Sequence, residues 1–579
     1  EPIKSSLIGC HCTVVECYIT QAEAFRFVEG EQLGTEIQPK CGGCKCSKCP
    51  IIGHTYSFHE EQELSLIRGN LQYDEQNQRW ITKYPWLVDP RSLPDNYSSA
   101  LATLKNTERK LQRDQTWAKV YNEQIQDMVN RGVARKLSEQ ELSEWEGPKF
   151  YLSHLAVSNP KSLSTPVRIV FNSSQPFHGV SLNSSLAKGP DSYLNNLLGI
   201  LLRWRENHVA IQADIRKMYN SIFIEPLEQH CHRFLWRNLD QDRKPDIYII
   251  ERVNMGDRPA AAISTEAIYM TTKLFEADHP RAAQLLRVST YVDDIVDSVD
   301  DSSKAEQLAI SADDILGKAG FKVKSWQFSG ENKPSLHSAL PEESGKDDPV
   351  TISKVLGVSW KPKQDTLHFC PVLNFSKKKR GVYTEPELMK EQIPDSIPLI
   401  LTRRMVLEQT MKLYDPMGIL SPFTLQAKIL LRETWTLKLQ WDDQLPFHLR
   451  DKWITFFTQL FQLAELEYDR CMKPSNASGD PSLVLLSDGS DMAYGFTAYI
   501  RWPTTERSYW SRLLLAKCRI APIQKLSTPQ MELNAAVVAK RGRKIIEQEK
   551  RFNFTEVHHL IDSETVLNML NKVSTRFKL

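Results

Sequence analysis

The sequence predicts a multi-domain protein of the α+β class, and three observations support this prediction. At 579 residues, the chain has room for about four domains of roughly 150 residues each. Hydrophobic residues make up 41% of the chain and charged residues 25%, which is typical of globular proteins and not of disordered or fibrous ones. Short apolar runs alternate with helical stretches in the middle of the chain, and a second strand-rich pattern begins near its end.

The N-terminal part divides into two segments. Residues 1–60 are rich in Cys and in turn-forming residues, and residues 61–147 are polar and largely helical in pattern. An apolar stripe with the 3.6-residue period of a helix predicts one buried helical face. Its members are Trp117, Val120, Tyr121, Ile125, Met128 and Val129.

The pattern then changes to strands between helices over residues 148–330. Apolar, strand-like runs lie at 167–171, 209–213 and 288–292. Residues 330–349 are rich in Ser, Pro, Glu and Asp, which predicts a loop, and a mixed segment completes the range 331–475.

The last part of the chain begins with a predicted interdomain linker at 473–481, which contains Pro, Ser, Asn and Gly. In the range 476–579 the pattern that follows is strand, strand, strand, helix, strand. This order predicts a separate α/β domain.

The overall charge gives the chain no net attraction to nucleic acid or membrane, and its hydropathy predicts no membrane span. Lys and Arg total 73 and Asp and Glu total 71, so the net charge is +2, and nucleic-acid binding would depend on local basic clusters. Such clusters lie at 377–380, 403–404 and 540–544, and each is more often a solvated face than a binding patch. No apolar run approaches the roughly 18 residues of a membrane span. No signal segment opens the chain, so we expect an intracellular, cytoplasmic piece of a longer polyprotein without membrane contact.

The first candidate site is the pair Asp293 and Asp294. Apolar, β-prone residues flank the pair on both sides, and Tyr291 precedes it. An Asp pair alone usually marks a solvated turn or a helix cap, but two carboxylates at the tip of a partly buried hairpin repel each other and raise each other's pKa. A hard divalent cation such as Mg²⁺ relieves this repulsion.

A third carboxylate could join this pair. Residues 209–213 form a short apolar run that ends in Asp214. If this strand lies beside the hairpin, the three carboxylates could hold two metal ions about 3.5–4 Å apart, which would activate a hydroxyl group and stabilise a leaving group.

Several motifs resemble those of reverse transcriptases. Tyr291-Val-Asp-Asp294 resembles their catalytic hairpin, and Asp214 with Tyr219 resembles their first palm motif. Residues 165–172 resemble the fingers strands, and residues 124–132 resemble the segment before the fingers. Residues 356–360 resemble the primer-grip hairpin, and residues 320–326 resemble the motif between palm and grip. The amino-acid sequence most resembles that of the BEL/Pao group of LTR retrotransposons, especially at 216–219, 232–237 and 414–420.

The resemblance implies a right-hand polymerase. Residues 61–147 would lead into the fingers, residues 148–330 would form fingers and palm, and residues 331–475 would form primer grip, thumb and connection. The implied activity is RNA-directed DNA synthesis, with Mg²⁺ or Mn²⁺ as cofactor. The implied partners are an RNA template, a DNA primer, their hybrid, dNTPs and other polyprotein products, within the cytoplasm or virus-like particles.

The resemblance also assigns roles to single residues. Asp214, Asp293 and Asp294 would hold the metal, and Arg168 would bind the triphosphate. Tyr219 would exclude a ribonucleotide by occupying the space of its 2′-hydroxyl, although it could instead be a core aromatic. Tyr291 would line the substrate site. The basic cluster at 377–380 falls where the thumb would begin, so it could contact the phosphates of template and primer.

One departure from the family pattern concerns the second palm motif. Many relatives carry Gln-Gly there, with the Gln positioning template and nucleotide, whereas this chain reads Val253-Asn-Met-Gly-Asp257. Gly256 is retained as a substrate-binding candidate and the Gln is absent, which bears on rate or fidelity more than on reaction class.

A second set of acids follows the linker. Asp488 ends an apolar strand, Glu532 lies in the first turn of a helix expected to begin with Thr528 as N-cap, and Asp562 ends another strand. Glu532 could instead have no catalytic role and only stabilise the start of the helix through its charge. The trio resembles ribonuclease H, which cleaves the RNA of RNA–DNA hybrids with two metal ions. No Asp or Glu other than Glu564 follows Asp562, so we expect a C-terminally truncated domain.

The cysteines gather near the N-terminus, since seven of the 11 precede residue 50. This distribution favours a reducing compartment and one local metal or redox cluster over a disulfide framework. Cys46, Cys49, His54 and His59 have the spacing of a retroviral-type zinc knuckle. An alternative zinc cage would use the thiols of Cys41, Cys44, Cys46 and Cys49, and a loop of reduced thiols without metal remains open.

The sequence bears on two rival functions. An aspartic protease is not supported, because neither Asp-Thr-Gly nor Asp-Ser-Gly occurs in the chain. The stronger alternative is a catalytically inactive, domesticated nucleic-acid-binding protein derived from such an element. The intact set of Asp214, Asp293 and Asp294 favours the enzyme.

Overall fold

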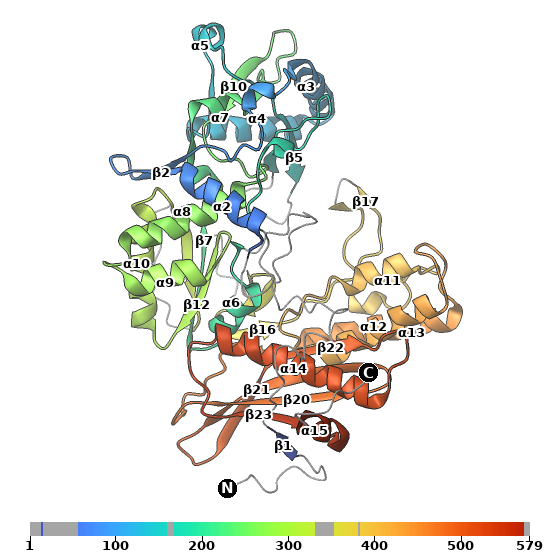
Figure 1. Cartoon of the computed structure of the whole chain (residues 1–579). Coiled ribbons are helices and arrows are strands. Elements are labelled where there is room, and N and C mark those ends of the chain that lie inside the picture. The colour runs from blue at the N-terminus through green and yellow to red at the C-terminus, as the bar shows by residue number, and fades with distance from the viewer. Residues whose placement is uncertain are drawn as a thin grey trace.

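The computed structural model describes residues 13–15, 56–158, 167–190, 193–330, 352–379 and 382–571. Helices and strands are mixed throughout, as the α+β prediction requires. Figure 1 shows an upper lobe, a central body, a helical lobe beside it and a lower sheet covered by α14 (Thr528–Glu549).

The upper lobe contains the predicted amphipathic helix as α4 (Gln115–Asn130). The side chain of Asp114 caps it by accepting a hydrogen bond from the N–H of Trp117 at 3.0 Å. Tyr121 and Ile125 are buried, and the rest of the stripe packs at the edge of the same core, which confirms the helical face. Neighbouring elements are α2 (Phe58–Asn70), β2 (Leu71–Asp74), β3 (Arg79–Thr82), α3 (Tyr97–Leu111), β4 (Ala134–Lys136), α5 (Glu139–Glu144), β5 (Ser153–Ser158) and β6 (Val167–Asn172).

The central body is an antiparallel sheet in the order β11-β12-β7-β13, which we call the central sheet. Its strands are β7 (Val209–Ile215), β11 (Thr290–Tyr291), β12 (Asp294–Val299) and β13 (Val323–Phe328). Three helices gather on one side of it (Figure 1): α8 (Ala260–Phe275), α9 (Pro280–Val288) and α10 (Ser302–Gly317). Helix α6 (Leu197–Trp204) precedes β7, and β8 (Phe223–Ile224) pairs with β3. The chain then returns to the upper lobe (Figure 1) as α7 (Pro226–His230), β9 (Arg233–Trp236) and β10 (Asp246–Ile250), where β10 pairs with β4.

One strand prediction in this body is wrong. The run 288–292 was expected to be a strand, but Val288 is the last residue of α9 and only Thr290 and Tyr291 are in β11. Leu285 and Leu286, one turn earlier, are buried, so packing of the apolar helix face outweighs the local β-preference of Val288.

The helical lobe shares a hydrophobic core with α6. Ile200, Leu201 and Trp204 of α6 pack in one cluster with Trp453 and Phe457 of α13 (Phe447–Leu460). The other elements here are β14 (Ser353–Val355), β15 (Val358–Lys361), β16 (Thr366–His368), β17 (Lys378–Lys379), β18 (Val382–Tyr383), α11 (Arg403–Thr410), α12 (Ser421–Thr436) and β19 (Glu467–Asp469).

The C-terminal domain has the predicted order of strand, strand, strand, helix, strand. The elements are β20 (Ser482–Gly489), β21 (Ala493–Pro503), β22 (Tyr509–Ile520), α14 and β23 (Val557–Ile561), followed by α15 (Glu564–Asn571). Strands β20 and β23 are parallel, whereas the other pairs in this sheet are antiparallel. Strand β1 (Thr13–Val15) pairs with β23 at the sheet edge.

The predicted start of α14 is off by one residue. Ser527, not Thr528, is the N-cap, because its backbone is extended and its N–H donates to Oε1 of Gln530 at 2.8 Å. In the described ranges, no helix combines the length and the apolar character that crossing a membrane would require.

A buried polar network surrounds Asp257 between the upper lobe and α8. Its carboxylate faces Nε2 of His232 at 3.0 Å and accepts from the hydroxyl of Ser173 at 2.6 Å and from that of Tyr84. Burial alone would lower the pKa of His232, but the charge of Asp257 and the carbonyl of Glu228 outweigh it, so the pKa is raised. Asp257 correspondingly keeps a lowered pKa despite its burial. Both shifts favour the ionised forms of His232 and Asp257.

We expect the pair to leave a pH signature on stability. The stabilisation from His232 is complete below its unfolded pKa of about 6.5 and is lost as pH rises through the higher folded pKa. His232→Gln should cost about 3–5 kcal/mol near pH 6, and the gap to wild type should narrow above pH 6.5 in thermal unfolding scans. His279→Gln, which affects the exposed partner of Asp314, should cost about 0–1 kcal/mol. A gap that widens above pH 6.5 would contradict the assignment.

Candidate carboxylate sites

Antiparallel pairing of β7 with β12 brings the first three acids together. Asp214 on β7 is the register partner of Asp294 on β12. The N–H of Ile215 donates to the carbonyl of Asp293 at 2.7 Å. Acids that are almost 80 positions apart in sequence therefore meet at one end of the central sheet.

The turn of this hairpin has an unusual backbone. Tyr291 pairs with Asp294, which leaves Val292 and Asp293 as a two-residue turn. Val292 has a φ of 56°, in the left-handed region that β-branched residues rarely adopt. Two-residue hairpins favour turns with positive φ at the first central residue, so the tight connection imposes strain of about 1–3 kcal/mol at the acidic tip.

The three carboxyl groups perturb one another electrostatically. Partial burial, followed by the charges of Asp293 and Asp214, raises the pKa of Asp294 to about 7. Burial and the charge of Asp293 likewise raise the pKa of Asp214. Burial raises the pKa of Asp293, which its own backbone and the charge of Arg168 offset in part. The site thus concentrates negative charge that a cation would stabilise.

The donor chemistry of this set fits a hard divalent cation, because Mg²⁺ prefers oxygen ligands. The side chains do not form a preformed cage, however. Among the residues that the structure describes, no group of three or more His, Cys, Asp or Glu side chains is arranged to hold a metal ion. What the structure supplies is adjacent, mutually repelling carboxylates.

Tyr219 and Arg168 lie within electrostatic reach of the acidic tip. Tyr219 is on a 3₁₀ turn (Met218–Ser221) that follows Lys217, whose φ is 49°. Burial, and then the charge of Asp293, raises the pKa of Tyr219. The ring also packs at the edge of the core. Arg168 is exposed on β6. Its charge offsets part of the rise in the pKa of Asp214 and of Asp293.

The segment that departs from the family pattern is tightly packed. A Cβ built on Gly256 would lie 2.4 Å from the carbonyl oxygen of Phe171, so only glycine fits there. Met255 is 63% exposed, whereas the amide of Asn254 donates to Asp257 at 3.0 Å. The side chain of Asn254 is thus committed to the buried network.

We expect Gly256→Ala to destabilise the protein by about 1–3 kcal/mol, because either β6 or the Gly256 segment must shift. The measurement is the thermal unfolding midpoint. Gly69→Ala in α2 is the matched control, since nothing lies within 4 Å of its added Cβ. Equal midpoints for the two variants would show that the contact with Phe171 is unimportant.

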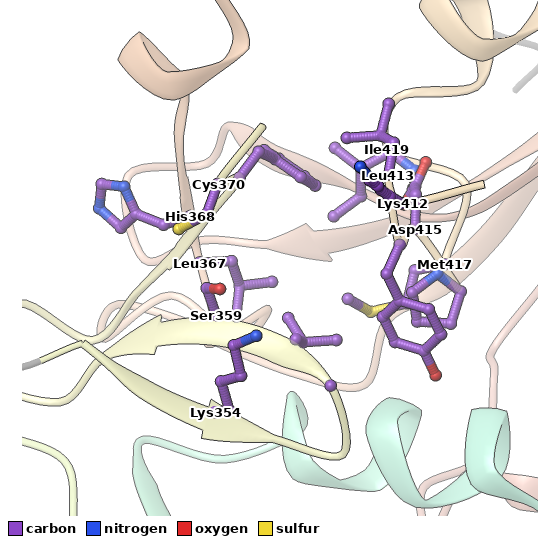
Figure 2. A pocket seen from close by; sticks show the side chains of 15 residues that line it. Lys354, Ser359, Leu367, His368, Cys370, Lys412, Leu413, Asp415, Met417 and Ile419 are labelled. Carbon is purple, nitrogen blue, oxygen red and sulfur yellow. Dashed lines mark hydrogen bonds between the residues drawn. The ribbon is translucent and has the colours of Figure 1, made fainter. Parts of the chain in front are cut away.

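A small cavity of about 80 Å³ lies close to the hairpin. Figure 2 shows Lys354, Ser359 and His368 on one side of it and the loop carrying Lys412, Asp415 and Met417 on the other.

One further cavity-lining residue, Tyr414, interacts electrostatically with Tyr291 of β11. Its ring lies 2.9 Å from the position a Cβ of Gly357 would take, and the charge of Tyr291 adds to burial in raising its pKa. Sequence reasoning assigned Tyr414 no role, although it lies in a segment with family resemblance.

The second acidic set also assembles at one edge of a sheet. β20 and β23 are parallel, with Leu486 opposite Leu560, so Asp488 and Asp562 leave the sheet at the same end. A Cβ on Gly489 would lie 2.6 Å from the backbone nitrogen of Glu532, which places the start of α14 against the end of β20. Asp488 and Asp562 are exposed, and Glu532 is half-buried.

The structure describes only some residues of the remaining predicted sites. Cys41, Cys44, Cys46, Cys49 and His54 lie outside the described residues, as does Arg380 of the basic cluster 377–380. His59 is exposed in α2.

In the basic pair at 403–404, Arg403 is buried and donates to the carbonyl of Thr434 at 2.8 Å. Arg404 pairs with Asp442 at 2.7 Å. Arg403 therefore has a structural role.

Comparison with known proteins gives one family match and two structural likenesses. Residues 402–563 match the family of the Pao retrotransposon-like RNaseH-like domain. No curated protein matches the chain. The foamy viral protease-reverse transcriptase dRH in complex with ds DNA is 15% identical, with a TM-score of 0.48 and coverage of 92% of this chain and 76% of that chain.

The second solved structure is the foamy viral protease-reverse transcriptase in complex with RNA/DNA hybrid. It is 13% identical, with a TM-score of 0.42 and coverage of 92% of this chain and 64% of that chain. At these values neither likeness supports an argument about function.

The family match includes α11 to β23 and all three residues of the second acidic set. It begins at residue 402, before the interdomain segment at 473–481. Residues 402–563 thus match the Pao retrotransposon-like RNaseH-like domain, in agreement with the BEL/Pao resemblance of the sequence motifs.

Proposed function

We propose that this chain is the RNA-directed DNA polymerase of a BEL/Pao-type retrotransposon, with an associated RNase H domain. The observation that supports it best is the register pairing of Asp214 with Asp294, which places Asp293 beside both. In this proposal the upper lobe corresponds to fingers, the central sheet to palm and the helical lobe to thumb and connection.

The chemistry is attack of a primer 3′-hydroxyl on the α-phosphorus of a dNTP, with pyrophosphate as leaving group. Asp214, Asp293 and Asp294 would hold Mg²⁺ or Mn²⁺. The metal would neutralise the charge that develops on the attacking oxygen and on the leaving oxygen. The raised pKa values of these residues support this role, because a cation favours their ionised form.

Other residues would orient the nucleotide and the strands. Arg168, exposed beside the acidic tip, would bind the triphosphate. The ring of Tyr219 would occupy the space of a ribose 2′-hydroxyl. In the C-terminal domain, Asp488, Glu532 and Asp562 would bind metal and cleave the RNA of an RNA–DNA hybrid.

Template-directed extension on poly(rA)·oligo(dT) tests the polymerase. Asp293→Asn should reduce extension at least about 100-fold, because one metal-binding charge is lost. Asp300→Asn is the matched control, since Asp300 is exposed beyond the end of the same strand, and it should extend normally. EDTA should abolish extension, and added Mg²⁺ or Mn²⁺ should restore it.

The rival function gives a different result in this assay. A wild-type chain that binds the hybrid but extends no better than Asp293→Asn would be a nucleic-acid-binding protein without polymerase activity. That outcome would reject the proposed enzyme.

The steric role of Tyr219 predicts a change in sugar selectivity. Tyr219→Val should raise the ratio of kcat/KM for an rNTP over the matching dNTP by about 10-fold or more, since the ring no longer fills the 2′ position. Tyr219→Phe keeps the ring and should keep the selectivity. If Tyr219→Val leaves the ratio unchanged, Tyr219 is only a packing residue.

A further inference from the structure

The end of α6 joins the central sheet to the C-terminal domain. Residues 203–206 read Arg-Trp-Arg-Glu and directly precede β7, the strand of Asp214. Figure 1 shows α6 beside one end of α14, and these two helices are in contact. All three charged side chains of this stretch bond to the C-terminal half of the chain.

Arg203 binds the last residue of α14, and Glu206 binds Arg551, two residues beyond it. Arg203 pairs with Glu549 and donates to the carbonyl of Val288 at 2.5 Å. Glu206 accepts from the backbone N–H of Arg551 at 3.0 Å and from its Nε at 2.7 Å. The side chain of Glu206 is 1% exposed, so its charge needs this partner.

A second buried carboxylate uses the same arginine. Asp297 is on β12, three residues after Asp294, and its side chain is 0% exposed. Nη2 of Arg551 lies 2.6 Å from one carboxylate oxygen of Asp297, and Nη1 lies 3.1 Å from the other. Arg281 of α9 also reaches this carboxylate, at 3.2 Å. One guanidinium group from the C-terminal domain thus bridges two buried acids of the central body.

Two more buried basic side chains, those of Lys550 and Arg205, complete the contact. Nζ of Lys550 donates to the carbonyl of Leu202 at 2.9 Å and lies 3.7 Å from Glu206. Arg205 donates to the carbonyls of Leu513 and Leu514 on β22 at 3.4 and 3.5 Å. The strands that carry Asp214 and Asp294 are therefore both tied to the C-terminal domain.

We propose that Arg551 is a positioning residue for the first carboxylate site, and that the C-terminal domain is a structural component of the polymerase. Without residues 549–551, Asp297 and Glu206 would lose a cationic partner inside the protein. Strand β12 would then loosen, and with it Asp293 and Asp294 at its start. The consequence for DNA synthesis rests on the proposed function, whereas the effect on β12 does not.

The test compares variants of the full chain by hydrogen–deuterium exchange over residues 290–299 and by primer extension. Arg551→Gln should lose exchange protection in β12 and lower kcat by about 10-fold to 100-fold with KM for dNTP unchanged, because the carboxylates are displaced. Arg551→Lys should fall between Arg551→Gln and wild type, since one ammonium cannot bridge both acids.

A double variant separates charge pairing from general damage. Asp297→Asn combined with Arg551→Gln removes one of the two buried carboxylate charges that Arg551 neutralises, and it should recover part of the protection and of kcat. Arg512→Gln is the matched control, because Arg512 pairs with Asp469 at the surface, and it should behave as wild type.

Three results would overturn the proposal. The first is an Arg551→Gln variant that is indistinguishable from Arg512→Gln, and the second is a double variant that is no better protected than Arg551→Gln. The third is that neither Arg551→Gln nor the double variant folds. If the wild type shows no extension at all, the proposed function fails, and the exchange measurements still decide the role of Arg551.

Discussion

The arrangement of the first site depends on the antiparallel register between β7 and β12. This register places Asp214 opposite Asp294, and the backbone bond from Ile215 to Asp293 fixes the turn beside them. The period of a strand is two residues, so a slip of one residue would point Asp214 to the other face. Strand pairing, not loop geometry, therefore brings these acids together.

The chain treats buried acids in two different ways. Asp257 and Asp297 are fully buried and lie against cationic partners, His232 in one case and Arg281 with Arg551 in the other. At the acidic tip the neighbours are other carboxylates, and the pKa of Asp294 rises to about 7. Strongly raised pKa values that geometry also supports are a mark of functional sites, which is why the tip and not Asp257 or Asp297 is the candidate for chemistry.

Much of the local structure was predictable from short-range patterns. The stripe from Trp117 to Val129 predicts α4, and the apolar run before Asp214 predicts β7. The strand order after residue 481 was also correct. The pattern failed at Val288, where burial of a helix face outweighed local preference, and at the start of α14, where Ser527 rather than Thr528 has the extended backbone of a cap. Asp297 is also a signal in the sequence, since an acid inside an apolar strand needs a buried partner.

The amino-acid sequence by itself determined which acids end which strands, because strand periodicity and the flanking apolar residues are local properties. It also contains motifs, contiguous in the chain, that resemble those of the BEL/Pao group. Only the tertiary structure decided that Arg551 pairs with Asp297 and Glu206, and that Tyr414 packs on Gly357 near Tyr291. These partners are separated by tens to hundreds of residues, and their contacts arise from the docking of whole domains, which no local pattern encodes.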